Sequence, residues 1–163
     1  MTDDDVIDWT PELKKEALEI IHKYRYGPLF TPPSTLDNAD GKQGTIFIPG
    51  NDATAWYAQG YDPEAKVLYV STGNSAQVIK LVPSKNPKSN IPLVRKDLDP
   101  LLGPRGLPSP FKPPYGRITA IDLNKGEILW TSVNGDGPRD HPAIKHLNLP
   151  DRKSTRLNSS HGY

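Results

Sequence analysis

The chain contains no cysteine, which excludes disulfide bonds and thiolate metal sites. It also has almost no net charge, because 20 Lys and Arg residues stand against 19 Asp and Glu, a formal charge of +1. A global electrostatic attraction to nucleic acid is therefore absent, and we expect no nucleic-acid partner. Hydrophobic residues make up only 35% of the 163 residues. That is little for a compact domain with a full core of its own.

Long apolar runs are absent as well. No stretch approaches the roughly 20 residues that a membrane-spanning helix needs. The first residues, MTDDDVIDW, are acidic where an export signal is basic and then apolar. We therefore expect membrane association only through parts outside this chain. The chain is instead rich in proline (18) and glycine (13), which favour turns between short strands.

The clearest strand pattern is the hairpin at residues 116–131, GRITAIDLNKGEILWT. Two extended runs flank a turn in which Asp122 can accept hydrogen bonds from backbone amides and Gly126 can adopt a positive φ. Trp130 gives the outgoing strand a large side chain to bury against a neighbour. One hairpin cannot form a core alone, so the pattern favours a repeat architecture such as a propeller.

Only residues 10–25 show a helical pattern. Thr10 can cap this helix, Pro11 suits its first turn, and Lys23 and Arg25 suit its last. We interpret His22 as a surface residue rather than a metal ligand, since no other ligands with metal spacing accompany it. Trp9, just before the helix, is a candidate hydrophobic staple.

Residues 44–82 predict a blade, a four-stranded meander with short strands near 44–48, 55–61, 67–71 and 77–82. The Pro-rich segment 83–115 predicts a long surface excursion rather than a packed element. In the loop after Trp130, a metal or acid–base cluster of Asp136, Asp140 and His141 is one reading. A solvated turn is the favoured one, because Gly and Pro explain the segment without chemistry.

The last residues, 151–163, differ from everything before them. DRKSTRLNSSH resembles the translation of a common sequencing-library adapter at every position. We therefore expect this tail to be an artefact that takes no part in the fold. We also expect the natural protein to be longer at both ends.

The spacing Ala120-x-Asp122-x-x-x-Gly126-x-x-x-Trp130 resembles the tryptophan-docking motif of quinoprotein dehydrogenase β-propellers, with Lys125 where the family usually has Thr. More broadly, residues 4–150 look like part of a glucose-dehydrogenase-type enzyme dependent on pyrroloquinoline quinone (PQQ). The carrying segments, in order, are GPLFTPPS (27–34), GTIFIPGN (44–51), YDP (61–63), LYV (68–70), GLP (106–108) and PPYG (113–116).

This resemblance implies an all-β fold, a partial β-propeller of about two blades out of eight, with one N-terminal helix. It implies PQQ with calcium or magnesium in the whole protein, a sugar or alcohol substrate, ubiquinone or a cytochrome as electron acceptor, and a periplasmic location. No catalytic residue or metal ligand of the family matches a residue here, so the chain alone should be inactive.

One position carries over to the cofactor. Trp56 resembles an aromatic residue that lies near PQQ in the family, although Ala55 replaces an Asn that contacts the cofactor in some members. A place for Trp56 in the core between blades is the other reading. The alternative function is a non-catalytic propeller scaffold for protein–protein interaction in the cell envelope. The FTPPS segment, the GTIFIPGN strand and the Pro-rich insertion favour the dehydrogenase.

Overall fold

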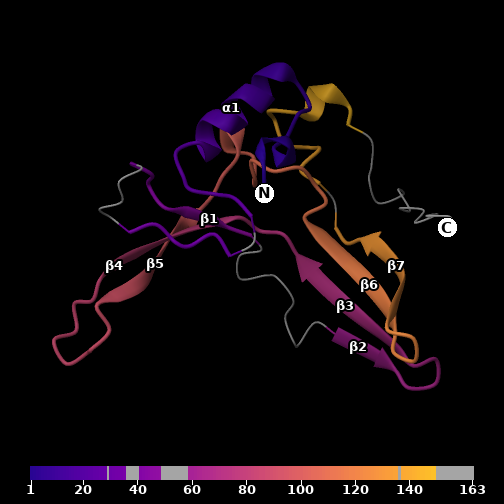
Figure 1. Cartoon of the computed structure of the whole chain (residues 1–163). Coiled ribbons are helices and arrows are strands. Elements are labelled where there is room, and N and C mark those ends of the chain that lie inside the picture. The colour runs from indigo at the N-terminus through magenta and orange to yellow at the C-terminus, as the bar shows by residue number, and fades with distance from the viewer. Residues whose placement is uncertain (29, 36–40, 49–58, 136, 150–163) are drawn as a thin grey trace. The chain divides into compact units, whose positions relative to one another are not determined.

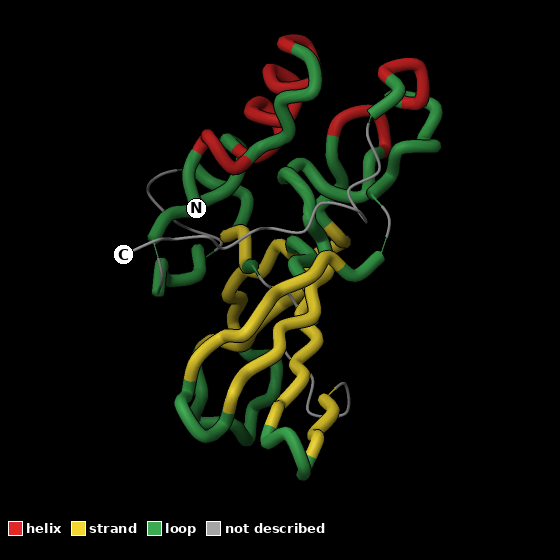
Figure 2. The backbone as a smooth tube through the Cα atoms, turned by 90° about the vertical axis from the view of Figure 1, so that its right-hand side faces the viewer, coloured by secondary structure: helices red, strands yellow, loops and turns green. Residues whose placement is uncertain are grey.

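The computed structural model describes residues 1–28, 30–35, 41–48, 59–135 and 137–149. The chain divides into two compact units: residues 1–50 with 76–112, and residues 51–75 with 113–163. Each unit contains one antiparallel sheet. Strands and loops dominate, and helix is confined to short segments (red in Figure 2). The prediction of an all-β fold with one N-terminal helix is confirmed.

The helix of the first unit, α1 (Pro11–Ile21), begins as the sequence predicts. Thr10 Oγ1 accepts a hydrogen bond from Leu13 N at 3.2 Å, which satisfies one of the free amides of the first turn. Three residues at helical spacing turn inward and are buried, namely Leu13, Ala17 and Ile21. The charged face stays largely in solvent, so α1 is an amphipathic helix with one buried stripe.

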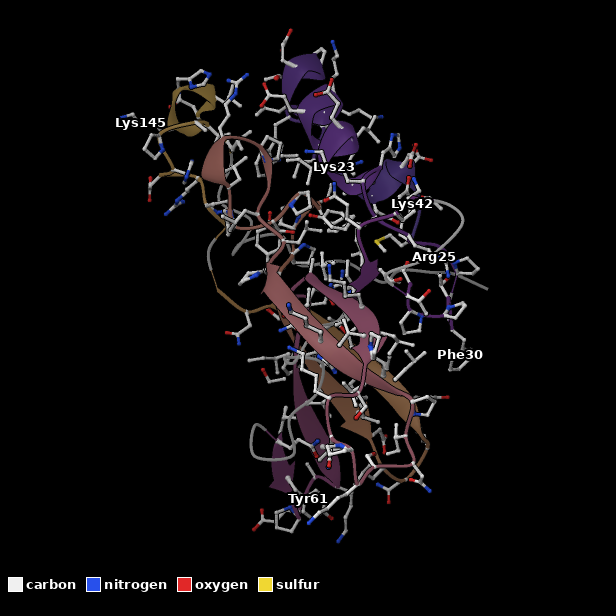
Figure 3. All side chains as sticks on the ribbon, turned by 90° about the vertical axis from the view of Figure 1, so that its left-hand side faces the viewer. Lys23, Arg25, Phe30, Lys42, Tyr61 and Lys145 are labelled. Carbon is white, nitrogen blue, oxygen red and sulfur yellow. The ribbon has the colours of Figure 1, made fainter. Side chains whose placement is uncertain are left out.

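The helix ends at Ile21, four residues earlier than predicted. Arg25 has left the helix and pairs with strand β1 (Thr45–Phe47): its N donates to Gly44 O and its O accepts from Ile46 N, both at 2.8 Å. Tertiary pairing therefore overrides the local helical pattern. Lys42 Nζ donates to His22 O at 2.6 Å. Figure 3 shows Lys23 and Lys42 beside this end of α1, where positive charge is favourable.

The sheet of the first unit has the order β1-β4-β5. Strand β4 (Gln77–Pro83) lies between β1 and strand β5 (Leu93–Pro100), and a long loop joins β4 to β5 in a hairpin (Figure 1). A buried polar cluster supports the sheet edge, because Ser34 N donates to Thr45 Oγ1 at 2.7 Å and Ser34 O accepts from Leu81 N at 2.9 Å.

The segment 83–115 is not only a surface excursion, so that prediction is wrong. It contains β5, and the part after β5 is packed: a short 3-10 turn, η3 (Pro104–Gly106), lies among buried residues that include Leu101, Leu107, Pro110 and Phe111. An antiparallel bridge joins Phe111 to Val6. Prolines prevent a helix in this segment but do not prevent its side chains from being buried. Composition alone therefore could not distinguish a packed segment from a surface loop.

The sheet of the second unit has four antiparallel strands in the order β2-β3-β6-β7. Their bounds are Gln59–Asp62 (β2), Val67–Gly73 (β3), Gly116–Asp122 (β6) and Glu127–Val133 (β7). Two tight hairpins, β2–β3 and β6–β7, meet along the β3–β6 ladder, which runs from Val67↔Asp122 to Gly73↔Gly116. Four strands of this length are typical of one propeller blade.

The predicted meander of residues 44–82 is therefore wrong in its pairing, although the described strands are close to their predicted positions. Strand β1 pairs with β4 in one sheet, and β3 pairs with β6 in the other. The sequence shows which residues are extended but not which strands pair across 30 or more residues. The predicted start of the second strand, at Ala55, lies outside the described residues. Among the described residues, no helix has the length and apolar character to cross a membrane.

Candidate functional site

The predicted docking-motif hairpin is present as β6–β7, and Asp122 organises its turn. Asp122 Oδ1 accepts from Asn124 N at 2.8 Å and from Lys125 N at 3.3 Å, while its backbone O accepts from Gly126 N at 2.7 Å. Gly126 has φ 72°, a left-handed conformation that glycine adopts without steric cost. Lys125 contributes its backbone N to this turn, so the missing Thr hydroxyl leaves the turn intact.

The remaining motif residues face one another across the ladder. Ala120, which is fully buried, pairs with Trp130, and the Trp130 ring lies 5.9 Å from the Tyr69 ring, centroid to centroid, at a tilt of 44°. A small residue at position 120 leaves room for these two aromatic rings on one face. Trp130 is still 44% exposed, so its face of the sheet is only partly covered.

The β2–β3 hairpin repeats the same turn. Asp62 Oδ1 accepts from Glu64 N at 2.9 Å and from Ala65 N at 3.0 Å. Lys66 has φ 56° at the position that corresponds to Gly126. Leu123 N donates to Lys66 O at 2.9 Å and ties the two turns together. We predicted a turn at Asp62 from the sequence but missed that this turn repeats the one at Asp122. The signal was present in the sequence, because in both hairpins an Asp ends the first extended run and the second run begins five residues later.

Large apolar side chains remain exposed on this sheet and its turns. They are Tyr61, Leu123, Ile128, Leu129 and Trp130, and Figure 3 shows Tyr61 near the end of the β2–β3 hairpin. A blade presents such side chains to the adjacent blades of a propeller. The exposure therefore fits a sheet whose full set of packing partners extends beyond the described residues.

At the opposite end of the sheet, two polar side chains have buried atoms without a hydrogen-bond partner. They are Ser75 Oγ, just after β3, and Arg117 Nε, near the start of β6. Leaving a buried donor unpaired is costly, more so when it is charged. Nothing in the sequence singled out these two residues. Both atoms can donate a hydrogen bond to an oxygen atom of a ligand.

The same end of the sheet also carries Tyr115. Burial raises the pKa of Tyr115 to about 12, so its phenol stays protonated at neutral pH. Asn74 N donates to Tyr115 O at 2.8 Å and closes the ladder. The predicted cofactor residue Trp56 lies outside the described residues. It precedes Gln59, the first residue of β2, by three positions, and β2 begins at this end of the sheet.

The other sequence candidates have structural explanations. His22 is exposed, and its Nε2 lies 3.1 Å from Asp3 Oδ2. In the loop after β7, Asp136 lies outside the described residues, Asp140 is 98% exposed, and His141 Nδ1 accepts from Ala143 N at 3.2 Å. No group of three or more potential metal ligands occurs in the described part of the chain. Trp9 is half-buried before α1, and its role as a staple stays a prediction.

Asp3 links the N-terminal segment to α1. The Tyr26 hydroxyl donates to Asp3 Oδ1, and the Tyr26 ring stacks on His22 with centroids 6.2 Å apart. The hydrogen bond from Tyr26, followed by that from His22, lowers the pKa of Asp3. Burial and the Asp3 contact raise the pKa of Tyr26 to about 12. This exposed cluster holds chain segments together, and we assign it no catalytic role.

Comparisons with known proteins identify a β-propeller family, which is consistent with the docking-motif hairpin. Residues 1–161 match the family model described as glucose/ethanol/alcohol dehydrogenase, β-propeller domain, of the PQQ type. The curated relatives include two proteins called quinoprotein glucose dehydrogenase. The one from Escherichia coli is 30% identical over 142 residues, which cover 74% of this chain and 17% of that protein. The one from Gluconobacter oxydans is 28% identical over 139 residues, 70% of this chain and 16% of that protein.

This chain therefore spans less than a fifth of the length of these relatives. The comparison with solved structures found no match. The family match covers nearly all of the chain, and the docking-motif hairpin and the four-stranded sheet are its structural counterpart. The chain belongs to the PQQ-dependent glucose/ethanol/alcohol dehydrogenase family and forms part of its β-propeller domain.

Proposed function

We propose that the chain is one portion of a PQQ-dependent dehydrogenase that oxidises a hydroxyl group of a sugar or alcohol, with a glucose-like sugar as the first candidate. The observation that carries this proposal is the family match over residues 1–161, which coincides with a well-formed docking-motif hairpin. Two relatives called quinoprotein glucose dehydrogenase support the sugar as substrate.

The residues at one end of the β3–β6 ladder fit the cofactor. PQQ carries carboxylate groups, and the unpaired Arg117 Nε and Ser75 Oγ are donors suited to a carboxylate. We assign these two residues to holding PQQ, and we keep Trp56 as a proposed aromatic contact. When bound, PQQ would supply the redox chemistry by accepting two electrons and two protons from the substrate.

The residues of this chain would orient the cofactor rather than abstract the substrate proton. A guanidinium group fixes a carboxylate by charge and direction together, and the buried setting of Nε strengthens that interaction because little water screens it. The base that takes the substrate proton, and the calcium or magnesium ion of the family, would come from segments that match nothing in this chain.

The remaining partners are proposals as well. Electrons would pass to ubiquinone or a cytochrome, and the enzyme would work in the periplasm. Family membership supports the acceptor, because a bound quinone that has oxidised a substrate needs an acceptor that regenerates it. The periplasmic location stays a prediction.

The test is to recover the gene together with its flanking sequence and to purify the encoded protein. We expect glucose-dependent reduction of a dye acceptor only after reconstitution with PQQ and calcium or magnesium. Replacement of Arg117 by Met should weaken PQQ binding by about tenfold or more, measured by fluorescence quenching, while Arg117→Lys should weaken it less. Ser132→Ala, at an exposed position on β7, is the matched control.

Two results would count against the proposal. If the purified protein binds no PQQ under any metal condition, the assignment to an active dehydrogenase fails. If it binds PQQ equally well with Arg117→Met, the enzyme assignment stands and only the role of Arg117 fails.

A further inference from the structure

The β4–β5 hairpin concentrates positive charge. Residues 77–100 contain five cationic side chains and two carboxylates, a net charge of +3 in a chain whose total is +1. The cations are Lys80, Lys85, Lys88, Arg95 and Lys96. No ion pair joins any of the four lysines to a described residue. The hairpin is thus a basic arm on a chain that is otherwise slightly acidic.

Two of these lysines lie directly opposite each other. Lys80 on β4 and Lys96 on β5 are cross-strand partners in the antiparallel ladder. Side chains in such a pair lie on the same face within about 5.5 Å at Cβ, and like charges there are destabilising. An anion bound between the two ammonium groups would remove this repulsion.

Beyond Arg95, the next positions of β5 toward the loop are apolar and exposed. Val94 on β5 pairs with Val82 on β4 and shares the face of Lys96, while Leu93 pairs with Pro83. Val94 is 38% exposed, Leu93 37%, and Ile91 in the loop 57%. The exposed surface therefore changes from charged to aliphatic along β5, within the length of one short strand.

Strand β5 is also an edge of its sheet, with β4 on one side and no strand on the other among the described residues. An edge strand offers backbone N–H and C=O groups to an added strand. Lysines on an edge can also serve only to prevent such pairing. That explanation accounts for Lys96 but not for Lys80, which lies on the central strand β4.

A polypeptide suits this surface better than a lipid bilayer does. The Lys80–Lys96 pair lies three ladder positions before the Pro83–Leu93 pair at the loop end, which is about 10 Å along the strands. A bilayer touching the loop would leave that pair about one Debye length away. An extended chain lying along β5 would reach both the charged and the apolar positions.

We propose that the edge of β5, with Lys80, Lys96, Leu93 and Val94, binds an acidic, extended segment of a partner polypeptide by strand addition. Its carboxylates on one face of the added strand would lie beside Lys96, within reach of the long Lys80 side chain across the β4–β5 ladder. Its aliphatic residues would contact Val94 on that face and Leu93 on the other. This inference rests on the geometry of the hairpin alone and is independent of the proposed redox function.

The experiment uses the full chain and a fluorescein-labelled peptide of three Glu-Glu-Val-Val repeats, which presents both Glu and Val on each face of an extended strand. Binding is followed by fluorescence anisotropy. We expect saturable binding that strengthens at low salt. The double substitution Lys80→Glu and Lys96→Glu should weaken it by about tenfold or more. The control Lys15→Glu with Lys145→Glu makes the same change in net charge at exposed positions outside the hairpin and should change binding less than about twofold.

A second probe tests strand addition without altering the protein. The same peptide with every backbone nitrogen methylated keeps its charge but loses the N–H donors of both edges, so we expect it to bind about tenfold more weakly. Three outcomes would overturn the proposal: equal loss of binding in the control pair, equal affinity for the methylated peptide, or binding to phosphatidylglycerol vesicles in place of the peptide.

Discussion

Two carboxylates, Asp62 and Asp122, hold equivalent turns in one sheet, and each accepts hydrogen bonds from the two backbone amides that follow its neighbour. The fourth residue after each Asp is left-handed: Lys66 with φ 56° and Gly126 with φ 72°. The turns differ mainly in how well that fourth residue tolerates its conformation.

We expect Asp122→Ala to lower the free energy of unfolding by about 1 kcal/mol, because two amides of the turn lose their acceptor. Asp62→Ala should have a similar effect, since Asp62 makes the equivalent bonds. Asn at either position keeps one carbonyl oxygen and should cost less. Urea unfolding measures all four variants. Wild-type stability in both Ala variants would show that water replaces the carboxylate without loss.

Lys66→Gly should stabilise the chain by about 1 kcal/mol, because a left-handed conformation is unfavourable for a residue with a Cβ atom. The reverse change, Gly126→Lys, should destabilise it by a similar amount. A thermal melt of the two variants side by side tests the pair. A lower melting temperature for Lys66→Gly would mean that contacts of the Lys66 side chain stabilise the fold by more than its left-handed backbone conformation costs.

Stability should fall as pH rises from about 10 to about 12. The pKa of Tyr26 and that of Tyr115 are both raised to about 12 in the folded chain, against about 10 when unfolded. A raised pKa stabilises the fold fully below the unfolded value and loses that effect as pH approaches the folded value. Between pH 9 and 12, the urea midpoint should depend less on pH in Tyr26→Phe and in Tyr115→Phe than in the wild-type chain. An unchanged slope in both variants would contradict the shifts.

The depressed pKa of Asp3 acts at the other end of the pH scale. The stability that ionised Asp3 contributes is present above its ordinary pKa near 3.8. This stability is lost as pH falls through the lower pKa that Asp3 has in the folded chain. Because the Asp3 side chain is 52% exposed, solvent screens its interactions and we expect a small effect, which Asp3→Asn should reduce further.

At the level of elements, the sequence predicted most strands well because turns marked by Gly, Pro, Asn and Asp bound them clearly. The strands of the β6–β7 hairpin and the roles of Asp122 and Gly126 were predicted, whereas Trp130, expected to be buried, is 44% exposed. The end of α1 was not, since Arg25 pairs with β1 through backbone groups that carry no sequence signal. Strand β5 was missed because its charged residues and flanking prolines resemble a loop.

The packed segment after β5 was missed for a related reason: its burial depends on contacts with residues 89 or more positions away. Arg105 Nη2 lies 2.6 Å from Glu16 Oε1 on α1, and Lys112 N donates to Asp5 O at 2.9 Å. The unpaired atoms Arg117 Nε and Ser75 Oγ could not be predicted either, because an unsatisfied buried atom is a property of packing and not of residue type.

Gly103→Ala should be among the most damaging changes in the first unit. A Cβ atom on Gly103 would lie 2.3 Å from Ser109 O, and Gly103 N already donates to Leu107 O at 2.7 Å. The backbone would have to move, so we expect a loss of more than about 2 kcal/mol. Gly106→Ala is the comparison, because a Cβ there meets no atom within 4 Å although φ is 80°. Equal losses in both variants would show that φ, not the close contact, decides the cost.

For the whole molecule, we expect the isolated chain to be weakly stable and to bind PQQ poorly. Many large apolar side chains of the four-stranded sheet are exposed, and the chain covers less than a fifth of its relatives. Calorimetric unfolding should give less than about 5 kcal/mol, below the usual range for a domain. A cooperative melt together with micromolar affinity for PQQ would contradict this expectation.

The order of the two units along the chain has one more consequence. The chain runs from the first unit to the second, back to the first, and again to the second. A single cut in the loop between β4 and β5 would leave β4 paired with β5 and β3 paired with β6 across the break. The two pieces would therefore act as complementary halves, held by two separate ladders, and neither half would contain a complete sheet of its own.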